Sequence, residues 1–303
     1  MANTENSLLV EKYRPKTLNN YVGNKNIKKS ISAYLNQNDI QNFIFYGPAG
    51  TGKTTLAKII VNSLDCDHLY INASDERGIE TIRDKVSSFA SVASFKPLKV
   101  VILDEADFLT IQAQASLRNI IETFSRTTRF IMTCNFVERI IDPLQSRCQV
   151  LKIVPPTKKD VAKHLNWICN EESITHEIND LVPLVNQYYP DLRKCINTIQ
   201  LSTQDSILKL DQSVLVSSNY IDKVITALTN KSKFNNIRQI IADANVDDFD
   251  ELFKALYERA SEYLPGKEGT ASILINEHQY KANFRIDKEI NTMSLIQNLI
   301  NNK

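Results

Sequence analysis

The chain has 303 residues and a formal net charge of +1, with 43% hydrophobic and 23% charged residues. This composition is typical of a soluble globular protein, and the length favours two or three domains. The small net charge argues against a surface that binds nucleic acid throughout, so any contact with DNA would be local or shared among several subunits.

Targeting signals and metal-binding patterns are absent from the sequence. It has no apolar run of about 18 residues, and its first residues lack the basic-then-apolar layout of a secretory signal. The five cysteines form no CxxC pair and the four histidines show no ligand spacing. We therefore expect reduced structural cysteines in a cytoplasmic protein (the host cytoplasm if viral) that is not secreted and not bound to a membrane.

The first half of the chain alternates strand and helix patterns. The apolar run FIFY at 43–46 precedes a glycine-rich loop and a helix whose Leu56, Ile59 and Ile60 recur at helical spacing. Further strands are predicted at 68–74, 99–105, 129–135 and 149–154, with helices at 78–90, 112–124 and 142–147. This rhythm predicts an α/β fold with a mostly parallel sheet covered by helices on both faces.

The sequence PPT at 155–157 ends this pattern, since proline cannot donate to a strand ladder. No further strand is predicted beyond it. Three amphipathic helices are expected at 158–171, 176–189 and 190–203. A second all-helical block runs from about 206 to the end, interrupted near 264–270, with a polar tail that we expect to fray. The predicted domains are 1–156 (α/β), 157–205 (small helical) and 206–303 (helical).

Residues 47–54 read GPAGTGKT and match the phosphate-binding loop G-x-x-x-x-G-K-[ST]. Small residues allow backbone N–H groups to converge on phosphate oxygens at the start of a helix. A lysine then supplies a charge to the β- and γ-phosphates, and a threonine hydroxyl coordinates Mg²⁺. A chance glycine turn before a helix is the alternative. The predicted nucleotide contacts are Gly50, Thr51, Gly52, Lys53, Thr54 and Thr55. Thr54 is also a predicted Mg²⁺ ligand.

Polar residues follow the later strands. Asp104 and Glu105 end the run VVILDE, where a carboxylate faces the ligand crevice of an α/β sheet. Asp104 is a candidate Mg²⁺ ligand and Glu105 a candidate base for an attacking water. Asn135 ends the next strand, and Arg147 lies before the last one. Taken alone, Asp104 and Glu105 could be an acidic strand boundary, Asn135 a strand cap and Arg147 a solvated surface residue.

Seven segments in order resemble the AAA+ sliding-clamp-loader ATPases. The chain is similar to the small subunits of replication factor C, and still more to the large subunit of the tailed-bacteriophage clamp loader, especially at SSFASVASF. The resemblance covers residues 8 to about 201. The zinc-binding cysteines of bacterial clamp-loader subunits are absent, and the loop reads GPAG where GPPG is commoner. The matching segments are VEKYRPKTL, GPAGTGKTT, INASDERGIETIR, VVILDEAD, IMTCN, PLQSRCQ and YYPDLRKCINTIQ.

The resemblance implies an ATP hydrolase with ATP and Mg²⁺ as cofactors, in which a AAA+ core is followed by a helical lid and an oligomerisation collar. Asn135 would be sensor 1, Arg193 would be sensor 2, and Arg147 would be an arginine finger that completes the site of the neighbouring subunit. The adenine pocket would be lined by Lys12, Tyr13 and Val22. Lys53, Glu105, Asn135, Arg147 and Arg193 would act in catalysis.

The resemblance also implies partners: a sliding clamp, primer–template DNA and other clamp-loader subunits, in an assembly of five. Helix N-termini are natural phosphate binders, which makes two helix starts candidate DNA contacts. Arg77 could instead be a surface salt-bridge residue, and Gln114 could couple its helix to the region of Glu105. The candidate DNA contacts are Arg77, Gly78, Ile79, Thr110, Gln112 and Gln114.

The function that the resemblance implies is a clamp-loader motor that uses ATP to open a clamp and load it onto DNA. Two alternative functions remain. One is another AAA+ DNA-remodelling motor, such as a branch-migration helicase. Against it stands the lack of a strand-containing winged-helix pattern after residue 206. The other is a structural subunit that binds nucleotide without hydrolysing it, against which the intact Lys53, Asp104, Glu105 and Arg147 argue.

Overall fold

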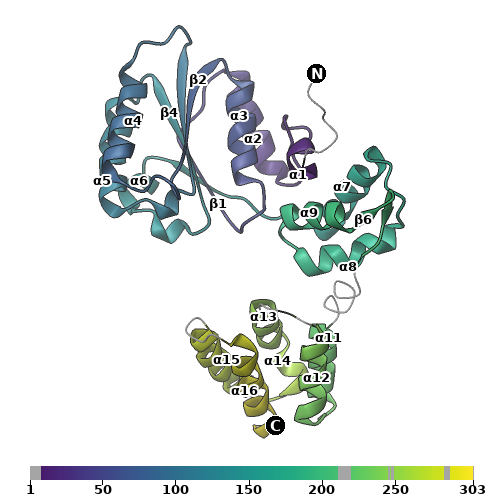
Figure 1. The fold of residues 1–303 in the computed structure, drawn as a ribbon. Helices are drawn as coiled ribbons and strands as arrows, with labels where there is room; N and C mark the ends of the chain where they lie inside the picture. Colours follow the sequence, from purple (N-terminus) through teal and green to yellow (C-terminus); the bar gives the residue numbers. More distant parts are fainter. Residues whose placement is uncertain (1–7, 211–219, 245, 247–248, 283–286, 303) are drawn as a thin grey trace. The chain divides into compact units, whose positions relative to one another are not determined.

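The computed structural model describes residues 8–210, 220–244, 246, 249–282 and 287–302 (Figure 1). The chain divides into two compact units, Met1–Leu181 with Tyr188–Leu201, and Val182–Gln187 with Ser202–Lys303. None of the helices in the described residues is long and apolar enough to cross a membrane. The three-domain division drawn from the sequence remains a prediction.

The first unit contains a five-stranded parallel sheet in the order β2-β3-β4-β1-β5. All five predicted strands are confirmed: β1 has the predicted bounds, and the ends of the other strands differ by at most two residues. Every residue of β3 is buried, because helices cover both faces of the sheet. The strands are β1 (Phe43–Tyr46), β2 (Cys66–Asn72), β3 (Leu98–Asp104), β4 (Thr128–Cys134) and β5 (Gln149–Lys152).

Two hydrophobic clusters lie on opposite faces of this sheet. Successive side chains of β3 lie on opposite faces of the sheet, so Ile102 packs in one cluster and Leu103 packs in the other. Helices α2 (Lys25–Asn36) and α3 (Lys53–Ser63) cover one face, and α4 (Ile79–Ser91), α5 (Ile111–Thr123) and α6 (Asp142–Gln145) cover the other (Figure 1). The predicted layering is confirmed.

The parallel arrangement brings the carboxyl ends of β1, β3 and β4 to one edge of the sheet. The phosphate-binding loop follows β1, Asp104 ends β3, and Asn135 follows β4. Short 3₁₀ turns at Ala106–Phe108 and Val137–Arg139 continue from this edge. Thr54 and Asp104, which are 50 positions apart in the sequence, and Lys53 and Asn135, which are 82 apart, are thereby placed around one site.

Three of the remaining helices before residue 203 follow the sequence prediction: α7 (Lys158–Glu171), α8 (Ile178–Tyr188) and α9 (Leu192–Ser202). Neither the short helix α1 (Leu9–Lys12) nor α2 is predicted from the sequence. Helix α9 starts at residue 192, not at 190 as predicted, because the carboxylate of Asp191 accepts hydrogen bonds from the backbone N–H groups of Arg193 and Lys194.

The prediction that no strand follows residue 157 is wrong. A two-stranded antiparallel pair is formed by β6 (Thr203–Gln204) and β7 (Ile207–Leu208). Asp205 and Ser206 connect them with φ values of 51° and 60°. Two consecutive residues with positive φ match the twist of a two-residue hairpin, and the sequence carries no glycine there to signal it.

The second unit is helical beyond β7 in its described residues. Its helices are α11 (Tyr220–Thr229), α12 (Phe234–Ala244), α13 (Asp250–Glu258), α14 (Ala260–Tyr263), α15 (Glu268–Ala282) and α16 (Lys288–Asn301). The predicted interruption lies between α14 and α15. Residues 211–219 and 283–286, within the predicted helical block, lie outside the described residues. The predicted fraying of the tail is wrong, because Leu295, Ile296 and Leu299 of α16 are buried in the core of this unit.

Candidate nucleotide-binding site

Two glycines of the loop between β1 and α3 have no room for a side chain. Gly47 has a φ of 147°, and a Cβ added to it would lie 2.5 Å from the carbonyl oxygen of Ile153. Gly50 has a φ of 72°, and an added Cβ would overlap the carboxylate of Asp191. Helix α3 begins at Lys53, directly after the loop, so its free N–H groups face the loop. The local structure is that of an anion-binding helix N-terminus.

The ammonium group of Lys53 is held by three oxygens of its own chain. Nζ donates hydrogen bonds of 2.8 Å to the carbonyl oxygens of Gly47 and Pro48 and to Oδ1 of Asn135. The side chain is 8% exposed, and this burial lowers the pKa of Lys53. Lys53 and Asn135, selected separately from the sequence, are therefore in direct contact.

The carboxylate of Asp104 accepts three hydroxyl hydrogen bonds. Thr54 Oγ1 donates to Oδ1 at 2.7 Å, Thr133 donates to the same oxygen, and Tyr70 donates to Oδ2 at 2.7 Å. Burial and the bond to Asp104 raise the pKa of the Tyr70 phenol. Sequence reasoning missed Tyr70, although its place on β2, two residues before the partner of Asp104 in the β2–β3 register, could have suggested it.

Glu105 adopts a left-handed backbone, with φ 55° and ψ 42°. Such a conformation costs a residue other than glycine on the order of 1–3 kcal/mol and is often found at functional sites. Its N–H donates to Thr133 Oγ1 at 3.1 Å. Glu105 lines one cavity together with eight other predicted site residues: Gly50, Gly52, Lys53, Thr54, Thr55, Asp104, Asn135 and Arg193.

Asp107 is a second residue that sequence reasoning missed. It lies on the 3₁₀ turn after Glu105, and its Oδ2 accepts hydrogen bonds of 3.1 and 3.2 Å from the backbone N–H groups of Asn135 and Phe136. The residue is 7% exposed. Its Oδ1 is buried without a hydrogen-bond partner among the described residues. Asp107, the third acidic residue of the segment 104–107, therefore fixes the backbone that carries Asn135.

A second cavity adjoins the same loop on its other side. Tyr13 and Val22 line it, as predicted for an adenine pocket, and Arg193 lines this cavity as well as the first. Lys12 is not among its lining residues, since its ammonium pairs with Glu172 at 2.5 Å. The other lining residues are Val10, Arg14, Pro15, Tyr21, Gly50, Thr51, Gly52, Thr55, Pro156, His164, Leu192 and Ile196.

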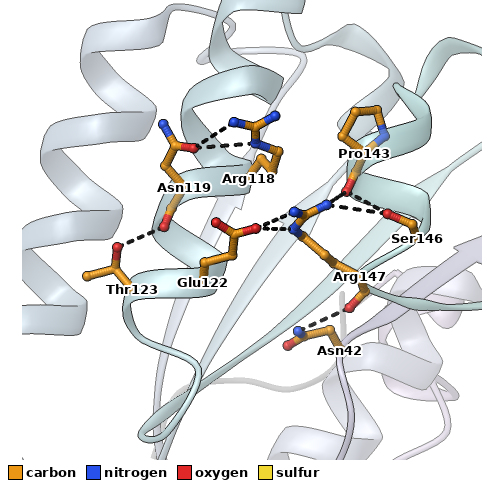
Figure 2. A network of polar contacts seen from close by, with 8 residues as sticks. All are labelled: Asn42, Arg118, Asn119, Glu122, Thr123, Pro143, Ser146 and Arg147. Carbon is orange, nitrogen blue, oxygen red and sulfur yellow. Dashed lines mark hydrogen bonds and ion pairs between the residues drawn. The ribbon is translucent and has the colours of Figure 1, made fainter.

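Arg147 lines neither of these two cavities. Figure 2 shows its guanidinium between the end of α5 and the segment around α6. Nε donates to Oε1 of Glu122 at 2.7 Å, Nη2 donates to the same oxygen, and Nη1 donates to the Pro143 carbonyl at 2.6 Å. The structure thus places Arg147 apart from the groups that surround the phosphate-binding loop of its own chain.

The candidate DNA contacts at two helix starts lie side by side. The N–H of Thr110, which caps α5, donates to the carbonyl of Arg77 at 3.4 Å. Arg77 also donates to Ser74 O at 2.9 Å, and its guanidinium lies 5.4 Å from the centroid of the Phe108 ring. Gly78 and Ile79, at the start of α4, and Gln112 are exposed.

Gln114 does not share this exposure. Its side chain is 1% exposed, and its amide donates to the carbonyls of Leu109 and Arg139 and accepts from the N–H of Ile141. Direct DNA contact by Gln114 remains a prediction, and the structure places this side chain on the buried face of α5. Its hydrogen bonds link α5 to the segment that follows β4.

Comparisons with known proteins identify the family. Residues 43–156 match the ATPase family associated with various cellular activities (AAA). A replication factor C small subunit of Haloarcula marismortui is 39% identical over 248 residues, covering 79% of this chain and 72% of that protein. One of Aeropyrum pernix is 32% identical over 305 residues, covering 97% and 89%.

Solved structures agree on the fold. The Holliday junction branch migration motor RuvB of Thermotoga maritima superimposes with a TM-score of 0.58 at 17% identity, covering 88% of this chain and 92% of that chain. At this identity the likeness shows the AAA+ fold alone. The expected similarity to replication factor C small subunits is confirmed by sequence, and the chain belongs to the replication factor C small-subunit family of AAA ATPases.

Proposed function

We propose that this chain is the ATPase subunit of a sliding-clamp loader, which opens a clamp and loads it onto primer–template DNA. The observation that carries the proposal is the meeting of Lys53, Asp104, Glu105 and Asn135 around one phosphate-binding loop, in a chain 39% identical to a replication factor C small subunit. ATP binding would assemble the loader on the clamp, and hydrolysis would release the clamp closed on DNA. Such coupling requires that clamp and DNA bind the ATP state more tightly than the ADP state.

The oxygen donors at the end of β3 and at the start of α3 fit a magnesium ion. Thr54 and Asp104 place a hydroxyl and a carboxylate 2.7 Å apart, and Mg²⁺ is commonly bound by one or two protein oxygens together with phosphates and water. In the described residues no group of three or more acidic, cysteine or histidine side chains is arranged to hold a metal ion, and a site of this kind needs none. When bound, the ion would neutralise charge on the β- and γ-phosphates.

The other roles fall to this chain's own side chains. Lys53 would exchange its carbonyl partners for phosphate oxygens, and Glu105 would accept a proton from the attacking water. Asn135, held in place by Asp107, would orient that water or the γ-phosphate. Tyr13 and Val22 would contact the base, and Arg193 lines both cavities, where it would report the γ-phosphate.

We further propose that Arg147 acts in trans, on the nucleotide of a neighbouring subunit. Its absence from the lining of its own site and its 31% side-chain exposure support this role. An arginine supplied in this way stabilises the charge of the transition state and can be worth about 10³–10⁵ in rate. An isolated subunit should therefore hydrolyse ATP poorly.

DNA would be bound through its phosphates at the starts of α4 and α5. The adjacency of Arg77 and Thr110 supports one continuous contact surface formed by two helix N-termini. A few sequence-independent contacts from each of several subunits would suffice, which agrees with a net charge of +1.

The branch-migration alternative rests on the fold alone, at 16–18% identity. The two functions are separated by measuring steady-state ATPase activity with and without clamp and primed DNA. The proposal predicts weak activity that rises when both are present. Activity indifferent to the clamp would contradict it, and stimulation by a four-way junction alone would favour the alternative.

A further inference from the structure

The guanidinium of Arg147 is held from two sides by its own chain (Figure 2). Glu122, near the end of α5, accepts from Nε and Nη2 through the single oxygen Oε1. On the other side, Nη1 donates to the Pro143 carbonyl and, at 3.3 Å, to Ser146 Oγ. A long flexible side chain is thereby fixed in one orientation.

This ion pair contributes orientation more than stability. The side chains of Arg147 and Glu122 are 31% and 53% exposed, and ion pairs at such exposure add little to folding free energy. Nη2 has one acceptor among the described residues but carries two N–H groups, so one of them is left for an added oxygen. The pair therefore orients a cation without exhausting its donors.

We propose that Glu122 is a positioning residue for Arg147, which sets the guanidinium for the phosphate of a neighbouring subunit's nucleotide. The inference rests on the proposed trans role of Arg147. Orientation in advance matters because a reacting geometry missed by about 1 Å can cost on the order of a hundredfold in rate. Because Oε1 alone accepts both bonds, a neutral amide oxygen at this position can replace it.

The experiment separates the chain that supplies the arginine from the chain that supplies the site. Full-length Lys53→Ala chains supply Arg147, and full-length Arg147→Ala chains supply the intact nucleotide site. The two variants are mixed with companion subunits, clamp and primed DNA. If the mixture regains no ATPase activity, the trans role itself fails, before Glu122 is considered. With activity restored, Glu122 variants are introduced into the arginine-donating chain.

Glu122→Ala in the donating chain is expected to lower the kcat of the mixture about tenfold to a hundredfold, with the KM for ATP changed less than about twofold. Glu122→Gln keeps an oxygen in place of Oε1 and is expected to restore kcat to within about threefold. A Glu122→Ala mixture as active as the unaltered one would overturn the proposal. Higher activity would also overturn it, because Glu122 would then restrain the arginine.

Two controls exclude a purely structural role. Thr123→Ala changes the next residue of α5, whose hydroxyl bonds to the Asn119 carbonyl of the same helix, and is expected to leave kcat within about twofold. Glu122→Ala is also placed in the site-donating chain, which has no arginine to position. A loss there equal to the loss in the donating chain would overturn the proposal in favour of a folding role.

Discussion

The phenol of Tyr70 on β2 donates a 2.7 Å hydrogen bond to Oδ2 of Asp104, at the end of the neighbouring strand β3. The other carboxylate oxygen accepts from Thr54 and Thr133. Three hydroxyl groups from three segments thus fix the orientation of the carboxylate proposed to hold Mg²⁺. Groups that hydrogen-bond to a metal ligand orient it, and their removal commonly weakens metal binding by about tenfold to a hundredfold.

Tyr70→Phe should therefore weaken Mg²⁺-dependent nucleotide binding by about tenfold. The ring remains, and with it the contact of the Lys58 ammonium 5.0 Å from the ring centroid. The measurement is a Mg²⁺ titration of fluorescent ATP-analogue binding. Tyr34→Phe, which removes a 3.4 Å bond to Gln149 elsewhere in the fold, is the matched control. Equal Mg²⁺ dependence in the two variants would contradict this role of Tyr70.

Asp107→Ala should destabilise the first unit and disturb Asn135. It leaves two backbone N–H groups, of Asn135 and Phe136, without their acceptor, at a cost of about 1–3 kcal/mol for each group that stays buried. Chemical unfolding measures the loss, with Asp84→Ala on the exposed surface of α4 as control. Unchanged stability together with unchanged ATP hydrolysis would refute the role assigned to Asp107.

Arg77→Ala should weaken DNA binding uniformly across sequences and reduce the salt slope of log K by about 1, as expected for the loss of one phosphate contact. The measurement is primed-DNA binding by the full loader at several salt concentrations. Arg83→Ala, on the exposed surface of α4, is the comparison. A preference for particular bases, or an unaltered slope, would show that Arg77 does not bind phosphate.

The buried thiols predict a loss of stability at alkaline pH. Burial raises the pKa of Cys134 from 9.0 to about 12 and that of Cys169 to about 11. Because the folded pKa lies above the unfolded one, this stabilisation is complete below pH 9 and is lost as the pH rises toward 11–12. Unfolding midpoints should fall across that window. A midpoint that stays level would contradict the burial of these thiols as protonated groups.

The same thiols should react slowly with iodoacetamide in the folded protein. At pH 8 the thiolate fraction of Cys134 is about three powers of ten below that of an unfolded cysteine, and access is closed as well. Mass spectrometry of native and denatured samples measures the difference. Rapid native labelling of Cys134 would show that the site opens without nucleotide.

The sequence predicts the centre of the sheet well because β1 and β3 are largely apolar runs followed by polar or glycine-rich loops, and such runs indicate burial directly. The phosphate-binding residues are predictable because their chemistry demands a local motif. Tyr70 and Asp107 are not, since their roles arise from a register between strands and from a turn geometry. The β6–β7 hairpin is missed because its turn uses Asp205 and Ser206 instead of glycine.

The helical tail is missed for a different reason. Residues 295–303 are polar on average, and local composition therefore suggests fraying. Leu295, Ile296 and Leu299 of α16 pack in the core of the second unit, and this tertiary packing outweighs local preference. Gln114 shows the converse case, in which a polar residue at a helix start is buried because backbone groups satisfy its amide.

The central claim is that each active site is shared between two chains, and subunit mixing tests it most directly. Lys53→Ala and Arg147→Ala chains are each expected to be nearly inactive alone, because one lacks the phosphate contact and the other the transferred arginine. ATPase activity plotted against their molar ratio, with clamp and primed DNA present, should rise to a maximum at intermediate ratios. Activity that stays at the baseline at every ratio would contradict the account.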